Sequence, residues 1–175
     1  SKVLQNRIQL NEHQCTKVIA LFTTLTALAI SLFLFIQFDR ETGGFQFIDT
    51  FVWIQDQDVG FTIKYALGVD GISLPLVLLS SLLMTIAVLV SWRVNIRSKE
   101  YFVWMLILET AIFGVFTSLD LLLFFIFWEL ELIPMFFLIS VWGTGNRKNS
   151  AKKFLLYTIF GSAFMLVGFL VLGAA

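Results

Sequence analysis

Three glutamates, Glu109, Glu129 and Glu131, stand inside long apolar stretches of the sequence. A charged side chain at the centre of a membrane-spanning helix costs about 2.5–3.5 kcal/mol even on lenient insertion scales, so acids at such positions are candidates for function. Their chemistry would be the binding and release of protons within a membrane. The single cysteine, Cys15, and the single histidine, His13, suggest no disulfide, redox pair or zinc site.

The positions of two of these acids predict a similar depth. Counted from a predicted turn at residues 118–120, Glu109 lies about ten residues before it and Glu129 about nine residues after it. At 1.5 Å per residue, both lie about 14–15 Å from the turn, near the middle of a bilayer. A turn this short makes the two helices antiparallel neighbours, so the two carboxyl groups could share a proton.

The helix that carries Glu129 has two further unusual residues, Glu131 and Pro134. Glu129 and Glu131 are two residues apart, or about 200° around a helix, so they cannot face the same neighbour. Pro134 has no amide hydrogen, and it therefore leaves the carbonyl of Leu130 without its helical partner and loosens the helix. The alternative is that a membrane glutamate is neutral and only joins two helices by a hydrogen bond. This alternative stays open, most of all for Glu109 and Glu131.

The composition predicts the elements that must hold these acids. Of 175 residues, 58% are hydrophobic and only 14% are charged, whereas soluble domains carry about 25% charged residues. We therefore predict an all-α membrane protein with about five transmembrane helices. The length leaves no room for a soluble catalytic domain, and 12 basic against 12 acidic residues do not favour nucleic-acid binding. The predicted spans are residues 17–38, 70–92, 101–118, 120–142 and 153–175, in one transmembrane region over residues 1–175.

The long connection between the first two spans has a different pattern. Apolar residues recur there at every second position, in the runs Phe45, Phe47, Phe51, Trp53 and Phe61, Ile63, Tyr65, Leu67. This alternation predicts an amphipathic β-hairpin at the membrane surface, with turn-like residues at 55–58. An irregular aromatic loop anchored at the interface is the alternative.

The basic residues predict the orientation of the spans. Ten of the twelve lie near span ends on one side, and only Arg40 and Lys64 lie on the other. Because basic loops stay on the cytoplasmic-type side, we predict that the N-terminus is inside and the hairpin outside. Other residues predict interfaces and close helix packing: Trp53, Trp92 and Trp142 for the interfaces, and Gly114, Gly161 and Gly168 for the packing.

Three separate motifs, in order, resemble one family. They are GVDGISLPLVLL at residues 68–79, LLLFFIFWELELIPMFFLISVWG at residues 121–143 and AKKFLLYT at residues 151–158. With them, the sequence closely resembles the antiporter-like chain M of proton-translocating NADH:quinone oxidoreductase, respiratory complex I. The mitochondrial counterpart is called chain 4, and photosynthetic membranes have a corresponding subunit. The resemblance covers essentially the whole sequence.

The resemblance implies roles for four residues. Glu129, which follows a tryptophan, matches the essential membrane carboxylate of the family, and Lys153 matches a lysine that faces the proton path. Glu131 and Glu109 match residues that are acidic in only part of the family. As candidates for proton translocation, the four residues therefore follow the order Glu129, Lys153, Glu109 and Glu131.

The resemblance also implies the architecture and the partners. The family has fourteen spans with inverted five-helix repeats, and this sequence looks like spans two to six, without the later broken helix whose lysine would pair with Glu129. Since the sequence does not start with methionine and ends within an apolar run, we expect an internal piece of a longer protein. We expect no cofactor in this piece; NADH, flavin, iron–sulfur clusters and quinone would belong to partner subunits. The expected partners are other membrane subunits of complex I, including neighbouring antiporter-like chains, and the lipid bilayer.

Two other functions stay open at this point. One is a subunit of a multisubunit cation/proton antiporter, which resembles the same family and uses the same carboxylate without electron transfer. The other is a purely structural chain whose acids hold helices together. We expect a bacterial plasma membrane as the location, with the mitochondrial inner membrane and the thylakoid membrane as alternatives.

Overall fold

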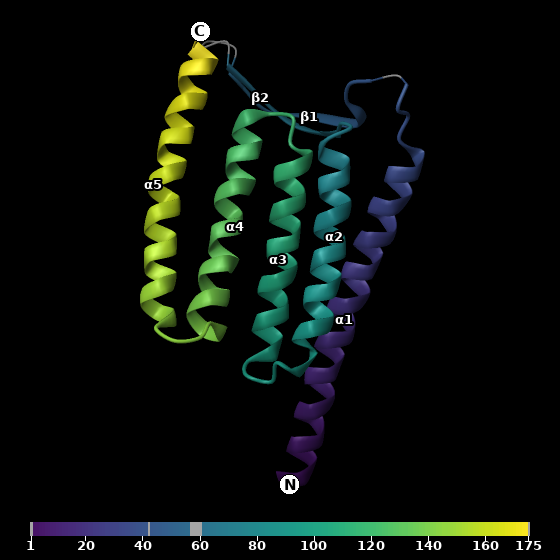
Figure 1. Ribbon diagram of the computed structural model, residues 1–175, viewed down its shortest axis with the longest axis vertical. Coiled ribbons are helices and arrows are strands. Elements are labelled where there is room, and N and C mark those ends of the chain that lie inside the picture. Colours follow the sequence, from purple (N-terminus) through teal and green to yellow (C-terminus); the bar gives the residue numbers. More distant parts are fainter. Residues whose placement is uncertain (1, 42, 57–60, 175) are drawn as a thin grey trace.

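The computed structural model is a row of five helices with a β-hairpin across one end (Figure 1). It describes the backbone of residues 2–41, 43–56 and 61–174, and the side chains of residues 14–41, 43–53 and 65–172. The elements are α1 (Lys2–Gln37), β1 (Gln46–Asp56), β2 (Phe61–Val69), α2 (Ser73–Val90), a 3₁₀ turn η1 (Ser91–Arg93), α3 (Ser98–Thr117), α4 (Leu121–Trp142) and α5 (Arg147–Ala174). The predicted five helices and the hairpin between the first two are confirmed.

Three helices begin earlier than the predicted spans. The helices α1, α3 and α5 begin at Lys2, Ser98 and Arg147, whereas the predicted spans begin at residues 17, 101 and 153. In α1, the segment apolar enough to cross a membrane is Gln14–Gln37, and residues 2–13 contain leucine, glutamine, lysine and arginine, all good helix formers, and neither glycine nor proline. Helical structure therefore continues beyond the apolar segment there, and hydropathy alone placed the start of the helix too late.

The hairpin is antiparallel but does not alternate strictly. Phe51 pairs with Tyr65, and the register shifts between Gln46 and Asp49 and again between Val52 and Ile54. The first shift is a bulge that turns the following side chains to the other face, so β1 does not present one continuous apolar face. Of the predicted turn, residues 55 and 56 belong to β1, and residues 57 and 58 lie outside the described residues.

The first three helices share a core. Ala20 of α1, Met84 and Val88 of α2, and Phe102 and Met105 of α3 form one buried cluster. Since α2 and α3 are antiparallel and joined by a short connection, this cluster also fixes which of their residues lie at the same level. The remaining helices extend the row, with α4 between α3 and α5 (Figure 1).

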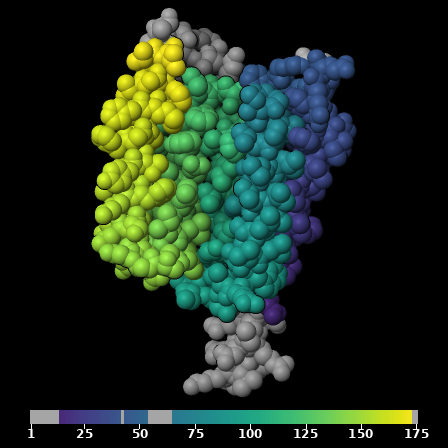
Figure 2. Space-filling model, viewed as in Figure 1, coloured from purple at the N-terminus to yellow at the C-terminus, as the bar shows by residue number. Residues whose placement is uncertain are grey.

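One of the three predicted packing glycines is confirmed, and the other two make no close contact among the described residues. A Cβ atom at Gly114 would lie 2.2 Å from the ring of Phe127, so α3 and α4 approach closely there. At Gly161 and Gly168 a Cβ atom would meet nothing within 4 Å. Both lie on α5, which is at the edge of the row with much of its surface uncovered (Figure 2).

One end of the bundle, called the outer end because the hairpin is predicted to lie outside, is joined to the hairpin by backbone contacts. The amide of Leu119, in the turn between α3 and α4, donates to the carbonyl of Ala66 at 2.9 Å, and Leu67 forms a bridge with Ser118. A Cβ atom at Gly68 would lie 2.8 Å from the side chain of Leu119. Glycine at this position therefore lets β2 lie against the turn.

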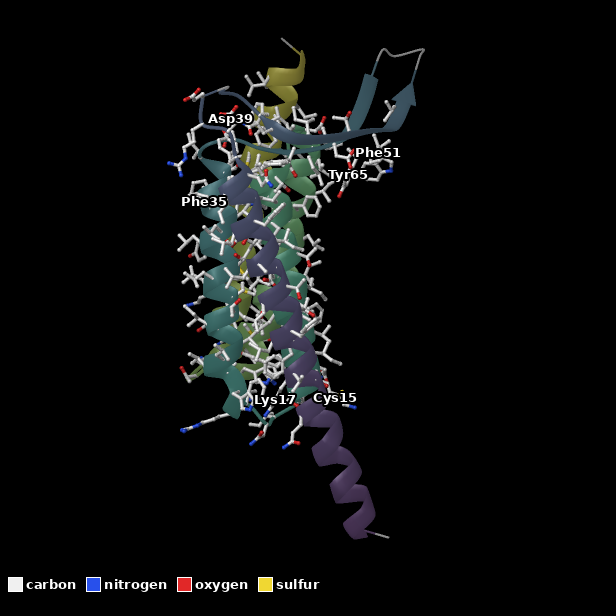
Figure 3. The ribbon with its side chains drawn as sticks, turned by 90° about the vertical axis from the view of Figure 1, so that its right-hand side faces the viewer. Cys15, Lys17, Phe35, Asp39, Phe51 and Tyr65 are labelled. Atoms are coloured by element: carbon white, nitrogen blue, oxygen red, sulfur yellow. The ribbon has the colours of Figure 1, made fainter. Side chains whose placement is uncertain are left out.

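The opposite end is held by a buried lysine. Lys17, only 7% exposed, donates from Nζ to the carbonyl of Trp92 at 2.7 Å and to Oδ1 of Asn95 at 3.2 Å. Figure 3 shows Lys17 at the end of the bundle where the α2–α3 connection lies. The side chain thus links α1 to the end of α2 and neutralises the partial negative charge of the carbonyl groups there.

The orientation leads to a labelling prediction. The test uses a full-length chain in which Cys15 is replaced by serine. We expect a cysteine at Asp49 to react with an impermeant thiol reagent from outside, and cysteines at Lys99 and Asn146 to react from inside. The reason is that ten of the twelve basic residues lie near the span ends opposite the hairpin. All three positions are exposed. Sealed vesicles of known sidedness provide the measurement. Reaction of position 49 from the inside alone would reverse the orientation.

Asp70 leads to a second prediction, on stability. Its Oδ1 accepts from the amides of Ser73 at 2.6 Å and Ile72 at 3.0 Å, and its own amide donates to Oγ of Ser73 at 2.9 Å. The bond from the Ser73 amide is the main cause that lowers the pKa of Asp70 below its ordinary value of 3.8. The two bonds that Asp70 accepts cap the start of α2, and their loss in Asp70→Ala should lower the free energy of unfolding by about 1 kcal/mol.

The pH dependence follows from the direction of that shift. Because the folded pKa is the lower one, the stabilisation is complete above pH 3.8 and is lost as the pH falls through the lowered pKa. Thermal unfolding in detergent, measured against pH, should show this dependence in the unmodified chain and not in Asp70→Ala. Asp49→Ala, on the exposed hairpin, is the control, and equal effects of the two changes would contradict the cap.

Candidate functional site

Glu129 lies on an apolar groove between α4 and α5. The groove has a volume of about 350 Å³ and is lined by Ile126, Glu129, Leu130, Leu132 and Ile133 of α4 and by Leu155 and Ile159 of α5. Oε1 of Glu129 is buried and has no hydrogen-bond partner among the residues that the structure describes. A carboxyl group with an apolar lining and no hydrogen-bond partner interacts strongly with any charge that approaches it.

The proline predicted to loosen this helix lies one turn from Glu129. Pro134 is buried inside α4, which continues as a helix on both sides of it. Because proline cannot donate, the carbonyl of Leu130 has no i+4 amide partner, and Leu130 lines the same groove as Glu129. The acid that lines the groove is therefore followed in α4 by a residue whose carbonyl lacks its i+4 amide partner.

Lys153 does not lie in this groove. It is exposed, and it lies two residues from Leu155, which lines the groove, so it points to about the opposite side of α5. It also lies six residues before Ile159, or about 9 Å farther along the helix axis. The structure therefore does not bring Lys153 to Glu129.

Glu109 faces away from Glu129. It is 3% exposed, and its Oε1 has no hydrogen-bond partner in the described part of the chain. It follows Phe102 by seven residues and Met105 by four, so it shares their side of α3, and those two residues pack on α1 and α2. Glu129 faces α5 instead. The two acids, predicted to be able to share a proton, lie on opposite sides of the α3–α4 pair.

Glu131, not Glu129, lies at the level of Glu109. The rings of Trp104 and Phe137 stack at 4.4 Å between α3 and α4, so these two residues lie at the same level. Glu109 lies five residues from Trp104 toward the outer end, and Leu132, the neighbour of Glu131, lies five residues from Phe137 in the same direction. Glu131 also lies on the side of α4 that contacts α3, four residues after Phe127, which meets Gly114. The acid of α4 that lies nearest to Glu109 in depth is therefore Glu131, and the prediction that Glu129 matches it is wrong.

A set of buried hydroxyl groups was missed from the sequence. Ser31 of α1 and Ser81 of α2 are 2.8 Å apart between their Oγ atoms, and Oγ1 of Thr85 donates to the carbonyl of Thr24 at 3.3 Å. All four residues are buried. Their spacing was the available signal, since Thr24 and Ser31 are seven residues apart and Ser81 and Thr85 are four apart, which places each pair on one helix face.

Metal chemistry has no support in the part of the chain that the structure describes. No three side chains of histidine, cysteine, aspartate or glutamate come together there in an arrangement that could hold a metal ion. The site therefore consists of carboxyl groups, hydroxyl groups and backbone carbonyls.

Comparison with known proteins shows which proteins the chain is similar to. Residues 118–174, which include α4 and α5, match a family model described as NADH:quinone oxidoreductase/Mrp antiporter, TM. The chain is 42% identical over 154 residues to NAD(P)H-quinone oxidoreductase chain 4 1 of Synechococcus elongatus, covering 87% of this chain and 28% of that one. It is 43% identical over 151 residues to NADH-quinone oxidoreductase subunit M of Rhodobacter capsulatus, covering 86% and 28%. It is 43% identical over 172 residues to NADH-ubiquinone oxidoreductase chain 4 of Prototheca wickerhamii, covering 91% and 33%.

The five apolar helices and the acid at mid-helix define the class, an integral membrane protein of the antiporter-like type. The chain belongs to the family of antiporter-like membrane subunits, and within it the relatives are subunit M and chain 4 of quinone oxidoreductases. It spans 28–33% of the length of these curated relatives.

Proposed function

We propose that this chain is part of a membrane subunit of a proton-translocating NADH:quinone oxidoreductase. It would move protons across the membrane while electrons pass from NADH to quinone in other subunits. The observation that carries this proposal is the unpartnered Glu129 on the groove between α4 and α5. The names of the relatives, subunit M and chain 4, support the same assignment.

Glu129 is the proton carrier in this proposal. In apolar surroundings its proton affinity responds strongly to any nearby charge, so a cation that approaches the groove releases the proton and a cation that withdraws restores it. The resemblance assigns that cation to a lysine on a later broken helix. Lys153, Glu109 and Glu131 follow Glu129 in falling order as candidates for proton translocation, since none of them lines the groove.

The proposed surroundings follow from the same function. Residues 1–175 act as one transmembrane region without a cofactor of its own, and NADH, flavin, iron–sulfur clusters and quinone belong to partner subunits. The partners are other membrane subunits of the complex, including neighbouring antiporter-like chains. The uncovered apolar side of α5, with Leu156, Phe160 and Phe164 each at least 66% exposed, supports a contact with protein or lipid there. We place the subunit in a bacterial plasma membrane, with the mitochondrial inner and thylakoid membranes as alternatives.

A second candidate is a subunit of a multisubunit cation/proton antiporter, because the matching family description names both kinds of protein. Affinity purification of the tagged full-length chain from its native membrane separates the two. We expect quinone-oxidoreductase subunits and NADH-dependent quinone reduction to co-purify with the chain. Co-purification of small antiporter subunits without any NADH-oxidising activity would replace the first proposal by the second.

A further inference from the structure

An apolar groove lies between α3 and α4 at the inner end of the bundle, which is the end opposite the hairpin. Its volume is about 320 Å³, and it is lined by Tyr101 and Met105 of α3 and by Leu138, Ile139, Trp142 and Gly143 of α4. The lining covers about one turn of each helix, or roughly 6 Å. Because tyrosine and tryptophan favour the membrane–water interface, the groove lies at the level of lipid headgroups and the first carbons of their acyl chains.

The aromatic rim of this groove is fixed by hydrogen bonds. Nε1 of Trp142 donates to the carbonyl of Ile96 in the α2–α3 connection at 2.7 Å. The hydroxyl groups of Tyr101 and Ser91 lie 2.8 Å apart and share a hydrogen bond. The rings of Tyr101 and Trp142 meet edge to face at 5.2 Å. The groove is therefore held in shape by the protein itself, as is usual for ligand sites.

Arg147 lies at the mouth of the groove. A Cβ atom at Gly143, which lines the groove, would be 3.3 Å from the Cβ of Arg147. The exposed guanidinium group donates from Nη1 to the carbonyl of Val141 at 2.5 Å. A guanidinium group has five N–H donors in a fork that fits a phosphate. In the described part of the chain, the bond to Val141 uses one of them, so donors remain for an anion.

The surroundings of Arg147 are strongly basic. Residues 91–100 and 143–153, the two connections at the inner end, contain one acid, Glu100, and seven basic residues: Arg93, Arg97, Lys99, Arg147, Lys148, Lys152 and Lys153. The two connections lie at the same end of the row (Figure 1), and the bond from Trp142 to Ile96 joins that end of α4 to the first of them. At the hairpin end, residues 39–70 and 118–120 contain seven acids and two basic residues. An anion is therefore attracted to the inner end and repelled from the other.

The combination of an apolar lining with a basic mouth selects the kind of anion. A free phosphate would use the guanidinium group and leave the apolar lining exposed, whereas an acyl chain would cover that lining. Basic pockets between membrane helices on the cytoplasmic-type side recognise lipid headgroups in this way. A zwitterionic headgroup would bring its own cation among the basic residues, so a headgroup with net negative charge fits better.

We propose that this groove binds an anionic phospholipid of the inner leaflet. Its phosphate lies at Arg147, and the first carbons of one acyl chain lie along Leu138 and Ile139. The groove shares no lining residue with the groove of Glu129. The lipid site therefore goes beyond proton translocation and does not depend on it.

The test is photolabelling of the purified complex that contains the full-length chain, in nanodiscs of phosphatidylcholine. The probe is phosphatidylglycerol with a diazirine group near the start of one acyl chain, and peptide mass spectrometry locates the labelled residues. We expect Met105, Leu138 and Ile139 to be labelled at least about fivefold more than by the phosphatidylcholine probe with the same chain, since each basic residue near a headgroup contributes about that factor. Glycerol phosphate, which has no acyl chain, should not compete.

Three variants test the role of Arg147. Arg147→Gln should lower the preference for phosphatidylglycerol about fivefold, and Arg147→Lys, which keeps the charge, should retain most of it. Arg40→Gln is the matched control, because Arg40 lines a groove of about 300 Å³ at the hairpin end. That change should leave the labelling between α3 and α4 unchanged.

Four results would overturn the proposal. They are equal labelling by the two lipids, an unchanged preference in Arg147→Gln, a loss in Arg147→Lys as large as in Arg147→Gln, and no labelling by either lipid. The third would show that Arg147 acts only through its bond to Val141, and the fourth that a protein segment covers the groove. If Arg147→Gln does not assemble, the comparison of the two lipids on the unmodified complex still decides. Proton pumping enters none of these measurements, so this proposal and that of Glu129 fail separately.

Discussion

Proton pumping falls at least about tenfold when Glu129 is replaced by glutamine in the full-length chain, because a positioned proton-transfer group contributes at least that much. Glutamine keeps the size and most of the hydrogen bonding but has no titratable proton. The complex should therefore assemble, while proton uptake and the quinone reduction coupled to it fall together. Proteoliposomes that contain the purified complex and a pH-sensitive dye provide the measurement.

Two variants control this experiment. Glu129→Asp keeps a titratable group that is one methylene shorter, so it should retain part of the pumping. Glu131→Gln removes an acid from the other side of the same helix, where it does not line the groove, and its effect should be milder. Normal pumping in Glu129→Gln together with loss of pumping in Glu131→Gln would show that the proton carrier lies on the other side of α4.

The second large effect is expected at Gly114, where α3 and α4 are closest. The Cβ of Gly114→Ala would lie 2.2 Å from two ring atoms of Phe127 and 2.5 Å from a third. A rigid ring between two helices cannot yield as the end of a flexible side chain can, so the helices must separate. Such overpacking typically costs about 1–3 kcal/mol, and we expect less assembled complex and a lower unfolding temperature.

The same protein offers matched controls for the glycine change. Gly161→Ala and Gly168→Ala add the same methyl group where no atom of the described residues lies within 4 Å, so neither should disturb the contact between α3 and α4. The double change Gly114→Ala with Phe127→Leu should recover part of the loss, because the ring that meets the new methyl group is gone. A Gly114→Ala complex as stable as the unmodified one would show that the ring can move aside.

Hydropathy and period-two alternation were sufficient to predict the five helices and the hairpin. They were not sufficient to orient the acids. The helices α3 and α4 are apolar on nearly all sides, so no stripe in their sequences indicates which neighbour Glu109 or Glu129 faces. The facing is decided by packing between residues far apart in the chain, such as Phe102 against Met84.

The glycines and hydroxyls illustrate the same limit. A glycine in an apolar helix predicts close packing, but only the neighbour decides it, and Phe127 is present for Gly114 while Gly161 has no neighbour. The bond between Ser31 and Ser81 joins residues 50 positions apart. Spacing shows which residues share a face, and it does not show which two faces meet.

The contact between the hairpin and the α3–α4 turn also sets an order of events during biogenesis. The chain is made from its N-terminus, so α1, the hairpin and α2 leave the ribosome before Leu119, whose amide donates to the carbonyl of Ala66. If the hairpin lies outside, Ala66 crosses the membrane first and its carbonyl is left to water until α3 is inserted and the turn arrives on the same side. Docking of the hairpin is then a late step, which takes place only after the first four helices have reached their final orientation.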